Sequence, residues 1–356
     1  GFRFDPGHDH GGKQPQQRVE DNLAAMRVLF ELESQPRKPS DEQKAVLAEY
    51  SGWGGIPTMF DYAGSKPGYV SAAESQITSW VDSDEIPLSL DDRRHMRGTI
   101  VNAHFTHGGV IRPMWSALDK LGVRLGRVLE PSAGALDFLS HKPATARSVR
   151  QVTGVELDSV TARIGALVHP QASVINQGLE KADLPTDFFD VSISNIPFGN
   201  YKVFDRARPE WNDTIHNYFV RKQLDLLKPG GVAAFVTSRY LLDALDTQVR
   251  EAVMEQAHVI NVVRLPSGAF SENTQTEVTT DIVLLQKKGD FEPNYEPLNI
   301  TESVPVAMAL KATSEQRIDG EMVAPGEMVE IPVNQVFAEQ PQRMMGELVA
   351  MSGRFD

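Results

Sequence analysis

The stretch FFDVSISNIPFGNY, residues 188–201, alternates apolar and polar side chains and then ends in an amide, a proline and a glycine. Alternation with a period of two predicts a β-strand, and the turn-forming residues after it predict where that strand stops. Comparable apolar runs occur at residues 126–134, 147–158, 172–178 and 230–238, with helical periodicity between most of them. Strands that alternate with helices predict an α/β domain with a mostly parallel sheet.

Two segments depart from this alternation. Residues 259–265 and 279–287 both have strand character, but the connection between them lacks helical periodicity, which predicts an antiparallel hairpin at the sheet edge. Upstream, residues 18–33 place apolar side chains at helical spacing, and Ser40 with Gln43 forms the signature of a capping box. A helical extension is therefore expected before the sheet.

From these patterns we expect three regions. They are a helical amino-terminal extension (residues 1–100), the α/β domain (residues 101–289), and an irregular, Pro-rich carboxyl-terminal extension (residues 290–356).

Composition narrows the classes of protein. The chain has 356 residues, a formal net charge of −13 and no cysteine, so disulfides, thiolate metal sites and cysteine nucleophiles are excluded. The charge argues against a surface that grips nucleic acid everywhere, although a local basic cleft is compatible with it. No apolar run reaches the length of a membrane span and no signal peptide is visible, so we expect a cytoplasmic protein. Because the sequence opens without Met, we expect a fragment or a processed product.

The residues that end the predicted strands suggest a site. In an open parallel sheet, ligands bind at the carboxyl ends of the strands. The run EPSAG at residues 130–134 offers small residues that let backbone approach a ligand, and Glu156 stands where a carboxylate can accept hydrogen bonds from a ribose. Asn195-Ile196-Pro197-Phe198 ends the fourth strand. Each piece alone is compatible with an ordinary turn, so their order and spacing carry the inference.

This series resembles the class I S-adenosylmethionine-dependent methyltransferases, and within them the DNA adenine-N6 enzymes, which carry an Asp/Asn-Pro-Pro-Tyr/Phe motif after the fourth strand. YSGWGGIP (residues 50–57), NIPFGNYKVFD (residues 195–205) and IHNYFVRKQLDLLKPGG (residues 215–231) resemble more narrowly the methyltransferase-helicase proteins of phages and conjugative elements, including the DarB-like antirestriction proteins. The resemblance covers most of residues 18–288. It implies a Rossmann-like fold with a seven-stranded, mostly parallel sheet, and S-adenosylmethionine as cofactor.

The resemblance also implies roles for individual residues. The expected catalytic residues are Asn195, Ile196, Pro197 and Phe198. The expected cofactor-binding residues are Phe105, Thr106, Glu130, Pro131, Ser132, Ala133, Gly134, Glu156, Leu157 and Glu180. No metal site is expected: His8 and His10 could chelate an ion, but a mobile terminus is the preferred interpretation.

The implied reaction is methyl transfer to the N6 amine of a flipped adenine in DNA. The oxygen of Asn195 and the carbonyl of Ile196 would accept the amine hydrogens, Pro197 would fix the backbone, and Phe198 would stack on the base. The implied partners are DNA and a downstream helicase region or another subunit that supplies target recognition, in phage or mobile-element DNA modification.

Two positions depart from the family pattern. Ile196 replaces a proline whose carbonyl is the working group, so this change is tolerable. Leu136 stands where EPSAG-x-G-x-F has its second glycine, and there a leucine could crowd the cofactor or demand an unfavourable dihedral angle. The alternatives are an inactive methyltransferase fold kept as a DNA- or protein-binding scaffold, or a methyltransferase acting on RNA or protein glutamine.

Overall fold

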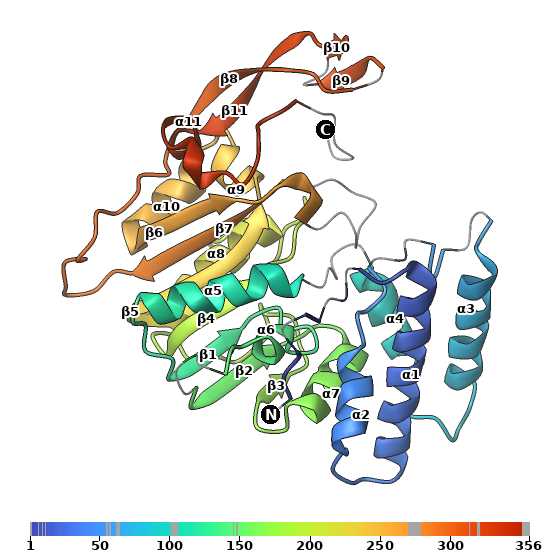
Figure 1. Ribbon diagram of the computed structural model, residues 1–356. Helices are drawn as coiled ribbons and strands as arrows, with labels where there is room; N and C mark the ends of the chain where they lie inside the picture. The colour runs from blue at the N-terminus through green and yellow to red at the C-terminus, as the bar shows by residue number, and fades with distance from the viewer. Residues whose placement is uncertain are drawn as a thin grey trace.

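Seven strands form the central sheet of the protein (Figure 1). They are β1 (Arg127–Glu130), β2 (Gln151–Val155), β3 (Ser173–Ile175), β4 (Phe189–Asn195), β5 (Leu227–Ser238), β6 (Ala257–Arg264) and β7 (Thr280–Lys287). Their spatial order is β3-β2-β1-β4-β5-β7-β6, and β7 alone runs antiparallel to its neighbours. The computed structural model describes residues 2–350 except 6, 9, 11, 55, 57, 62–64, 101–105, 145, 147–148, 270–278, 313 and 319–320.

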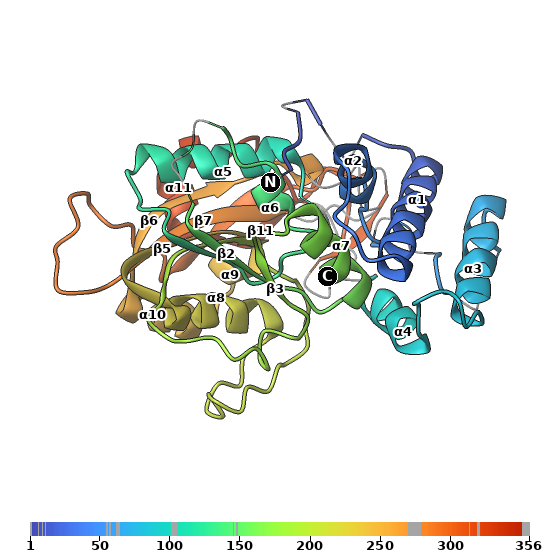
Figure 2. The ribbon, with the colours of Figure 1, turned by 90° about the horizontal axis from the view of Figure 1, so that it is seen from below.

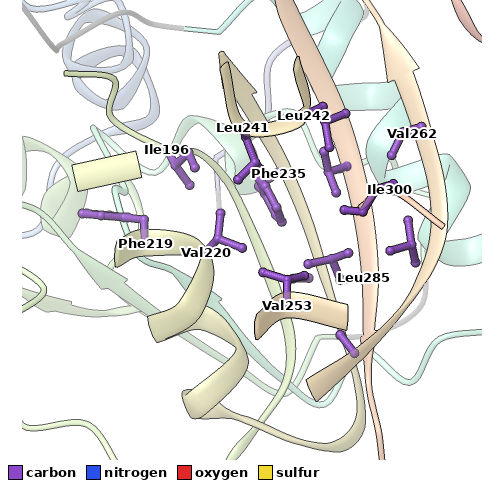
Figure 3. Close-up of a cluster of buried hydrophobic side chains, with 14 of the residues drawn as sticks. Ile196, Phe219, Val220, Phe235, Leu241, Leu242, Val253, Val262, Leu285 and Ile300 are labelled. Carbon is purple, nitrogen blue, oxygen red and sulfur yellow. The ribbon is translucent and has the colours of Figure 1, made fainter. Parts of the chain in front are cut away.

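Helices cover both faces of the sheet (Figures 1 and 2). They are α5 (Gly108–Lys120), α6 (Asp137–Ser140), α7 (Ser159–Val168), α8 (Ile215–Leu226), α9 (Tyr240–Asp243) and α10 (Gln248–Gln256). Along β5, Val232, Ala234 and Val236 belong to the core beneath α5, whereas Ala233 and Phe235 belong to the core beneath α8 and α10. Figure 3 shows the second core, with Phe219 and Val220 of α8 on one side of Phe235. Strands buried on both faces explain the nearly continuous apolar runs in the sequence.

The amino-terminal extension contains α1 (Pro15–Ser34), α2 (Asp41–Ala48), α3 (Gly68–Val81) and α4 (Leu90–Thr99). The predicted capping box at Ser40 and Gln43 is confirmed at the start of α2. These helices pack against α7 through a shared core to which α7 contributes Val160, Ile164 and Val168. The extension is therefore joined to the sheet by an apolar interface. No helix in the described ranges is long and apolar enough to span a membrane.

The region after residue 290 is more regular than expected. It holds β8 (Ser303–Ala309), β9 (Gln316–Ile318), β10 (Glu321–Val323), β11 (Met328–Asn334) and α11 (Gln335–Glu339), with β8 paired to β11 and β9 to β10. Asn334 ties this region to the main domain, because its side-chain amide donates to the carbonyls of Leu242 and Ile300 at 2.8 Å. β8 and β11 each contain a proline, and β9 and β10 have three residues each, which hid these strands from pattern analysis.

The antiparallel hairpin predicted at the sheet edge is confirmed, since β6 is the last strand of the sheet and pairs antiparallel with β7. Within the helical extension, residues 62–89 are rich in the Gly, Ser and Pro typical of a linker, yet α3 in this stretch is a helix of 14 residues. The mostly parallel, seven-stranded α/β fold with a helical extension is confirmed. The region boundaries at residues 100 and 289 stay a prediction.

Candidate active site

The loop after β1 bends sharply before α6 begins. Gly134 has a φ of 53°, and its amide donates to Oε2 of Glu156 at 2.8 Å. A positive φ is readily available to glycine, so this residue suits the turn that carries the loop towards β2. The EPSAG segment and the acid after β2 are thus hydrogen-bonded to each other, as their positions at neighbouring strand ends suggest.

The loop after β2 presents two carboxylates. Oε1 of Glu156 accepts from the amide of Asp158 at 2.8 Å, and Oδ1 of Asp158 accepts from the amide and hydroxyl of Thr161 at 2.7 and 2.8 Å. Burial raises the pKa of Glu156 to about 7. Oδ2 of Asp158 is buried and has no hydrogen-bond partner within the described part of the chain. Both side chains can accept further hydrogen bonds from a bound ligand.

The segment after β4 is anchored on both sides of its first peptide bond. The carbonyl of Asn195 accepts from the Ser132 hydroxyl at 2.6 Å, and the amide of Ile196 donates to the carbonyl of Val236 at 3.1 Å. The Ile196 side chain is buried in the core beneath α8 (Figure 3). The expected catalytic segment and the EPSAG loop are therefore held in fixed register by Ser132.

These loops enclose one cavity of about 220 Å³ at the carboxyl end of the parallel strands. Most of the residues expected from sequence line it: Thr106, Pro131, Ser132, Ala133, Gly134, Glu156, Leu157, Glu180, Asn195, Ile196, Pro197 and Phe198. Phe105 lies outside the described residues. The proposed cofactor and base positions thus face the same space.

Glu130 does not line this cavity. It is fully buried at the end of β1, and burial together with nearby Asp137 raises the pKa of its carboxyl well above the usual value. The amides of Phe138 and Leu139 oppose this shift. A cofactor role for Glu130 stays a prediction, and its position favours support of the loop from below.

Leu136 does adopt the unfavourable backbone conformation, with φ 65° and ψ 43°, but its side chain does not line the cavity. It is buried in the core beneath α5, where its Cδ2 lies 2.9 Å from the position that a β-carbon on Gly154 would occupy. Gly154 in β2 therefore leaves the room that Leu136 fills. Of the two consequences expected for this leucine, the structure shows the strained dihedral angle and no crowding of the cavity.

Several lining residues escaped the sequence analysis. Asp137, Asp158 and Thr161 come from the helix starts after β1 and β2, and Ile215 and Phe219 come from the first turns of α8. The last two are spaced by four residues, so they share one helix face. That periodicity was visible in the sequence, but only the fold shows that the face meets a ligand cavity instead of the core alone.

The helical extension contacts the residues at the start of α7 that line the cavity. Ser89 caps α4, and Asp92 completes the capping box by accepting from the Ser89 amide at 2.8 Å. The same carboxylate also accepts from the hydroxyl of Ser159 at the start of α7. Buried Tyr50, from the YSGWGGIP segment, lies close enough to Asp158 for that carboxylate to help raise the pKa of the phenol. The extension therefore fixes the amino terminus of the helix that carries Asp158 and Thr161.

The side chains of His8 and His10 are packed, contrary to a mobile terminus. The ring of Phe4 stacks on His8 with centroids 3.8 Å apart, and His10 is buried. Their ligand atoms and one from Glu49 lie within 4.8 Å of one another. Glu49 is also bound by the ammonium group of Lys13 at 2.7 Å, a competing cation that disfavours a metal there.

The strand order, with its one antiparallel strand beside the edge, and the cavity at the carboxyl strand ends are those of the class I S-adenosylmethionine-dependent methyltransferase fold. Residues 142–316 match the model of the N-6 DNA methylase family. The chain is also 27% identical over 273 residues to Defense against restriction protein B of Escherichia phage P1. The match covers 75% of this chain and 10% of that protein, so the chain spans about a tenth of its relative.

Solved structures with similar folds include a class I S-adenosylmethionine-dependent methyltransferase from Listeria monocytogenes, 17% identical with a TM-score of 0.45, which covers 79% of this chain and 92% of that one. Another is the methyltransferase subunit of a type I restriction-modification system from Streptococcus thermophilus. It is 13% identical with a TM-score of 0.46, and the similarity covers 86% of this chain and 84% of that one.

Proposed function

We propose that the chain transfers a methyl group from S-adenosylmethionine to the N6 amine of an adenine in DNA. The observation that carries this proposal is the hydrogen bond between Ser132 and the carbonyl of Asn195. It joins the loop expected to bind the cofactor to the segment expected to bind the base, so the two substrates would meet in one cavity with their reacting groups pre-positioned.

The side of the cavity formed by the first three strands suits the cofactor. Glu156 and the free oxygen of Asp158 can accept hydrogen bonds from ribose hydroxyls, while the backbone at Gly134 allows close approach. Glu180 would flank the adenine ring and Thr106 the methionine part. S-adenosylmethionine, once bound, supplies an electrophilic methyl group.

The opposite side suits an exocyclic amine. Its lone pair is delocalised into the adenine ring, which makes it a poor nucleophile. The Asn195 oxygen and the Ile196 carbonyl would accept its two hydrogens and thereby localise the lone pair, while Pro197 fixes the backbone angle. Phe198, which is half-buried between the two sheet cores, would stack on the flipped base.

Recognition of a DNA sequence is expected to come from elsewhere. The chain carries a net charge of −13 and spans a tenth of its phage relative, and we propose that a downstream region or another subunit supplies target recognition. The relative's name refers to defense against restriction, which supports a role in phage or mobile-element DNA modification, in the cytoplasm of a bacterial host.

The test compares the rates at which the wild-type chain and the Asn195→Ala variant transfer tritiated methyl groups to unmethylated duplex DNA. We expect the rate to fall by about 100-fold or more, because one preorganised acceptor is lost, while calorimetry shows unchanged affinity for S-adenosylmethionine. Asn200→Ala is the matched control, since Asn200 is an exposed amide in the same loop and should leave the rate unchanged.

Two results would contradict the proposal. Wild-type chain that binds no cofactor would support the inactive-scaffold alternative. When DNA, RNA and protein from one lysate are all offered, transfer of the tritiated methyl group to RNA or protein but not to DNA would show a different substrate for the same fold.

A further inference from the structure

The loop between β4 and α8, residues 196–214, exposes two aromatic rings, one of which lines the cavity. Tyr201 lines the cavity and is 45% exposed, and three residues later Phe204 is 67% exposed. The ring of Tyr201 lies over Gly199, where a β-carbon would come within 2.6 Å of it. In Figure 2 the loop runs out beyond α8 before it returns to that helix. An aromatic side chain is thus presented to solvent directly beside the expected base pocket.

The exposure of Phe204 is not a result of a slack loop. The next residue, Asp205, is buried, and its carboxylate accepts from the amide of Ala207, the hydroxyl of Tyr218 and the ammonium group of Lys222, each at 2.8 Å. The bonds from Tyr218 and Lys222 attach this part of the loop to α8, and the bond from Ala207 lies within the loop. Asp205 is thus held inside the protein while its neighbour Phe204 stays outside the packed part of the loop.

Exposed cations flank this ring. Lys202 and Arg206 are exposed and form no ion pair with a described residue. Of the three acids in the loop, Asp205 is paired with Lys222 and Asp213 with Arg221 at 2.9 Å, and only Glu210 is left exposed. In a chain with a net charge of −13, two unneutralised cations on either side of an exposed aromatic ring favour a polyanion with stacked bases as the partner.

We propose that residues 201–206 form a DNA-contacting finger, in which Phe204 wedges into the base stack next to the flipped adenine while Lys202 and Arg206 bind flanking phosphates. This inference rests on the proposed function and specifies how the same site opens its substrate. A ring held rigidly outwards can take the place of the extruded base, which lowers the cost of unstacking.

The first experiment compares Phe204→Ala on duplex DNA and on the same DNA denatured to single strands, with tritiated S-adenosylmethionine. A single strand has no stack to open, so transfer to it should persist while transfer to the duplex falls about tenfold or more. Met328→Ala is the control, because Met328 is similarly exposed on β11 and should change neither rate. An equal loss on both substrates, or no loss, would overturn the wedge.

The second experiment measures the salt dependence of binding to a fluorescein-labelled duplex by anisotropy. The double variant Lys202→Ala/Arg206→Ala should lower the slope of log K against log [salt] by about 2, because two phosphate contacts are lost. Lys120→Ala/Arg124→Ala removes the same charge from the opposite end of β1 and should leave the slope unchanged.

The two proposals fail in different ways. Wild-type chain that transfers no methyl group to DNA would overturn the proposed function. The salt dependence of duplex binding in the two double variants would then be the test of whether residues 201–206 contact DNA. Wild-type chain that does not bind the duplex, or a slope equal in both double variants, would overturn the finger while leaving methyl transfer to be judged by Asn195→Ala.

Discussion

At Leu136 two requirements compete within one residue. A left-handed backbone costs a leucine roughly 1–2 kcal/mol, yet the side chain gains burial in the core beneath α5 beside Gly154. Complete burial of a leucine contributes about 1.5–3 kcal/mol, so burial offsets the strain. At this departure from the family pattern, backbone strain is thus offset by burial of the side chain, and the side chain lies away from the cavity wall.

Replacing this leucine separates the two terms. Leu136→Ala keeps the strain and removes the packing, so we expect it to lower the free energy of unfolding by about 2–4 kcal/mol. Leu136→Gly also removes the strain, and it should be about 1 kcal/mol more stable than the alanine variant. Urea unfolding measures both, and calorimetry should find cofactor affinity unchanged. A glycine variant that binds S-adenosylmethionine much more tightly would show that the leucine obstructs the cavity after all.

Single residues were predictable where the chemistry is local. Asn195 to Phe198 and Pro131 to Gly134 follow strand ends that the sequence marks with small or turn-forming residues, and the fold brings them to one cavity. The packing of the Leu136 side chain in the core, away from the cavity, could not be predicted, because it depends on the space that Gly154 leaves on a neighbouring strand. Phe204 was equally hidden, since its exposure follows from the anchoring of Asp205 on α8.

Among the elements, α7 receives the most support from outside the sheet. Its first residue, Ser159, donates to Asp92 of α4, and Asp92 also completes the capping box with Ser89. Burial raises the pKa of Asp92, but hydrogen bonds from Ser159 and Ser89 together bring it below its usual value. One carboxylate therefore caps one helix and positions the start of another.

Asp92→Ala should destabilise the protein by about 1–2 kcal/mol at neutral pH, the usual effect of losing a helix cap. A depressed pKa adds stability above the unfolded-state value of about 4, and that stability is lost as the pH falls through the lower folded-state value. The gap in unfolding free energy between wild type and variant should therefore narrow below about pH 4. Urea unfolding at several pH values checks this, and a gap that stays constant with pH would contradict it.

Elements with strong periodicity were predictable, and weakly marked ones were not. The helix α1 contains residues 18–33, whose helical spacing was recognised, and α7 and α8 lie between strands where helical periodicity was found. α3 was missed because Gly, Ser and Pro surround it, although Val70, Ala73, Ile77 and Trp80 face the core at helical spacing. The strands β8 to β11 depend on pairing with one another, β8 with β11 and β9 with β10, which no local pattern shows.

For the whole molecule, the shared core around α7 predicts cooperative unfolding. Trp53 and Trp80 report on the extension, while Trp115 and Trp211 report on the sheet domain. Urea curves from tryptophan fluorescence should coincide with those from circular dichroism in both Trp53→Phe/Trp80→Phe and Trp115→Phe/Trp211→Phe. Two separated transitions in either variant would show that the extension and the sheet domain unfold independently.

The helix α7 belongs both to the core of the extension and to the cavity wall, and this limits which recombination events such a chain can tolerate in evolution. Val160, Ile164 and Val168 sit in the core of the helical extension, while the amino end of the same helix holds residues of the cavity wall. A recombination event that exchanged the sheet domain alone would inherit a helix with a bare apolar flank. The extension and the methyltransferase region are therefore expected to be inherited together, and substitutions on the two sides of their shared interface are expected to be correlated.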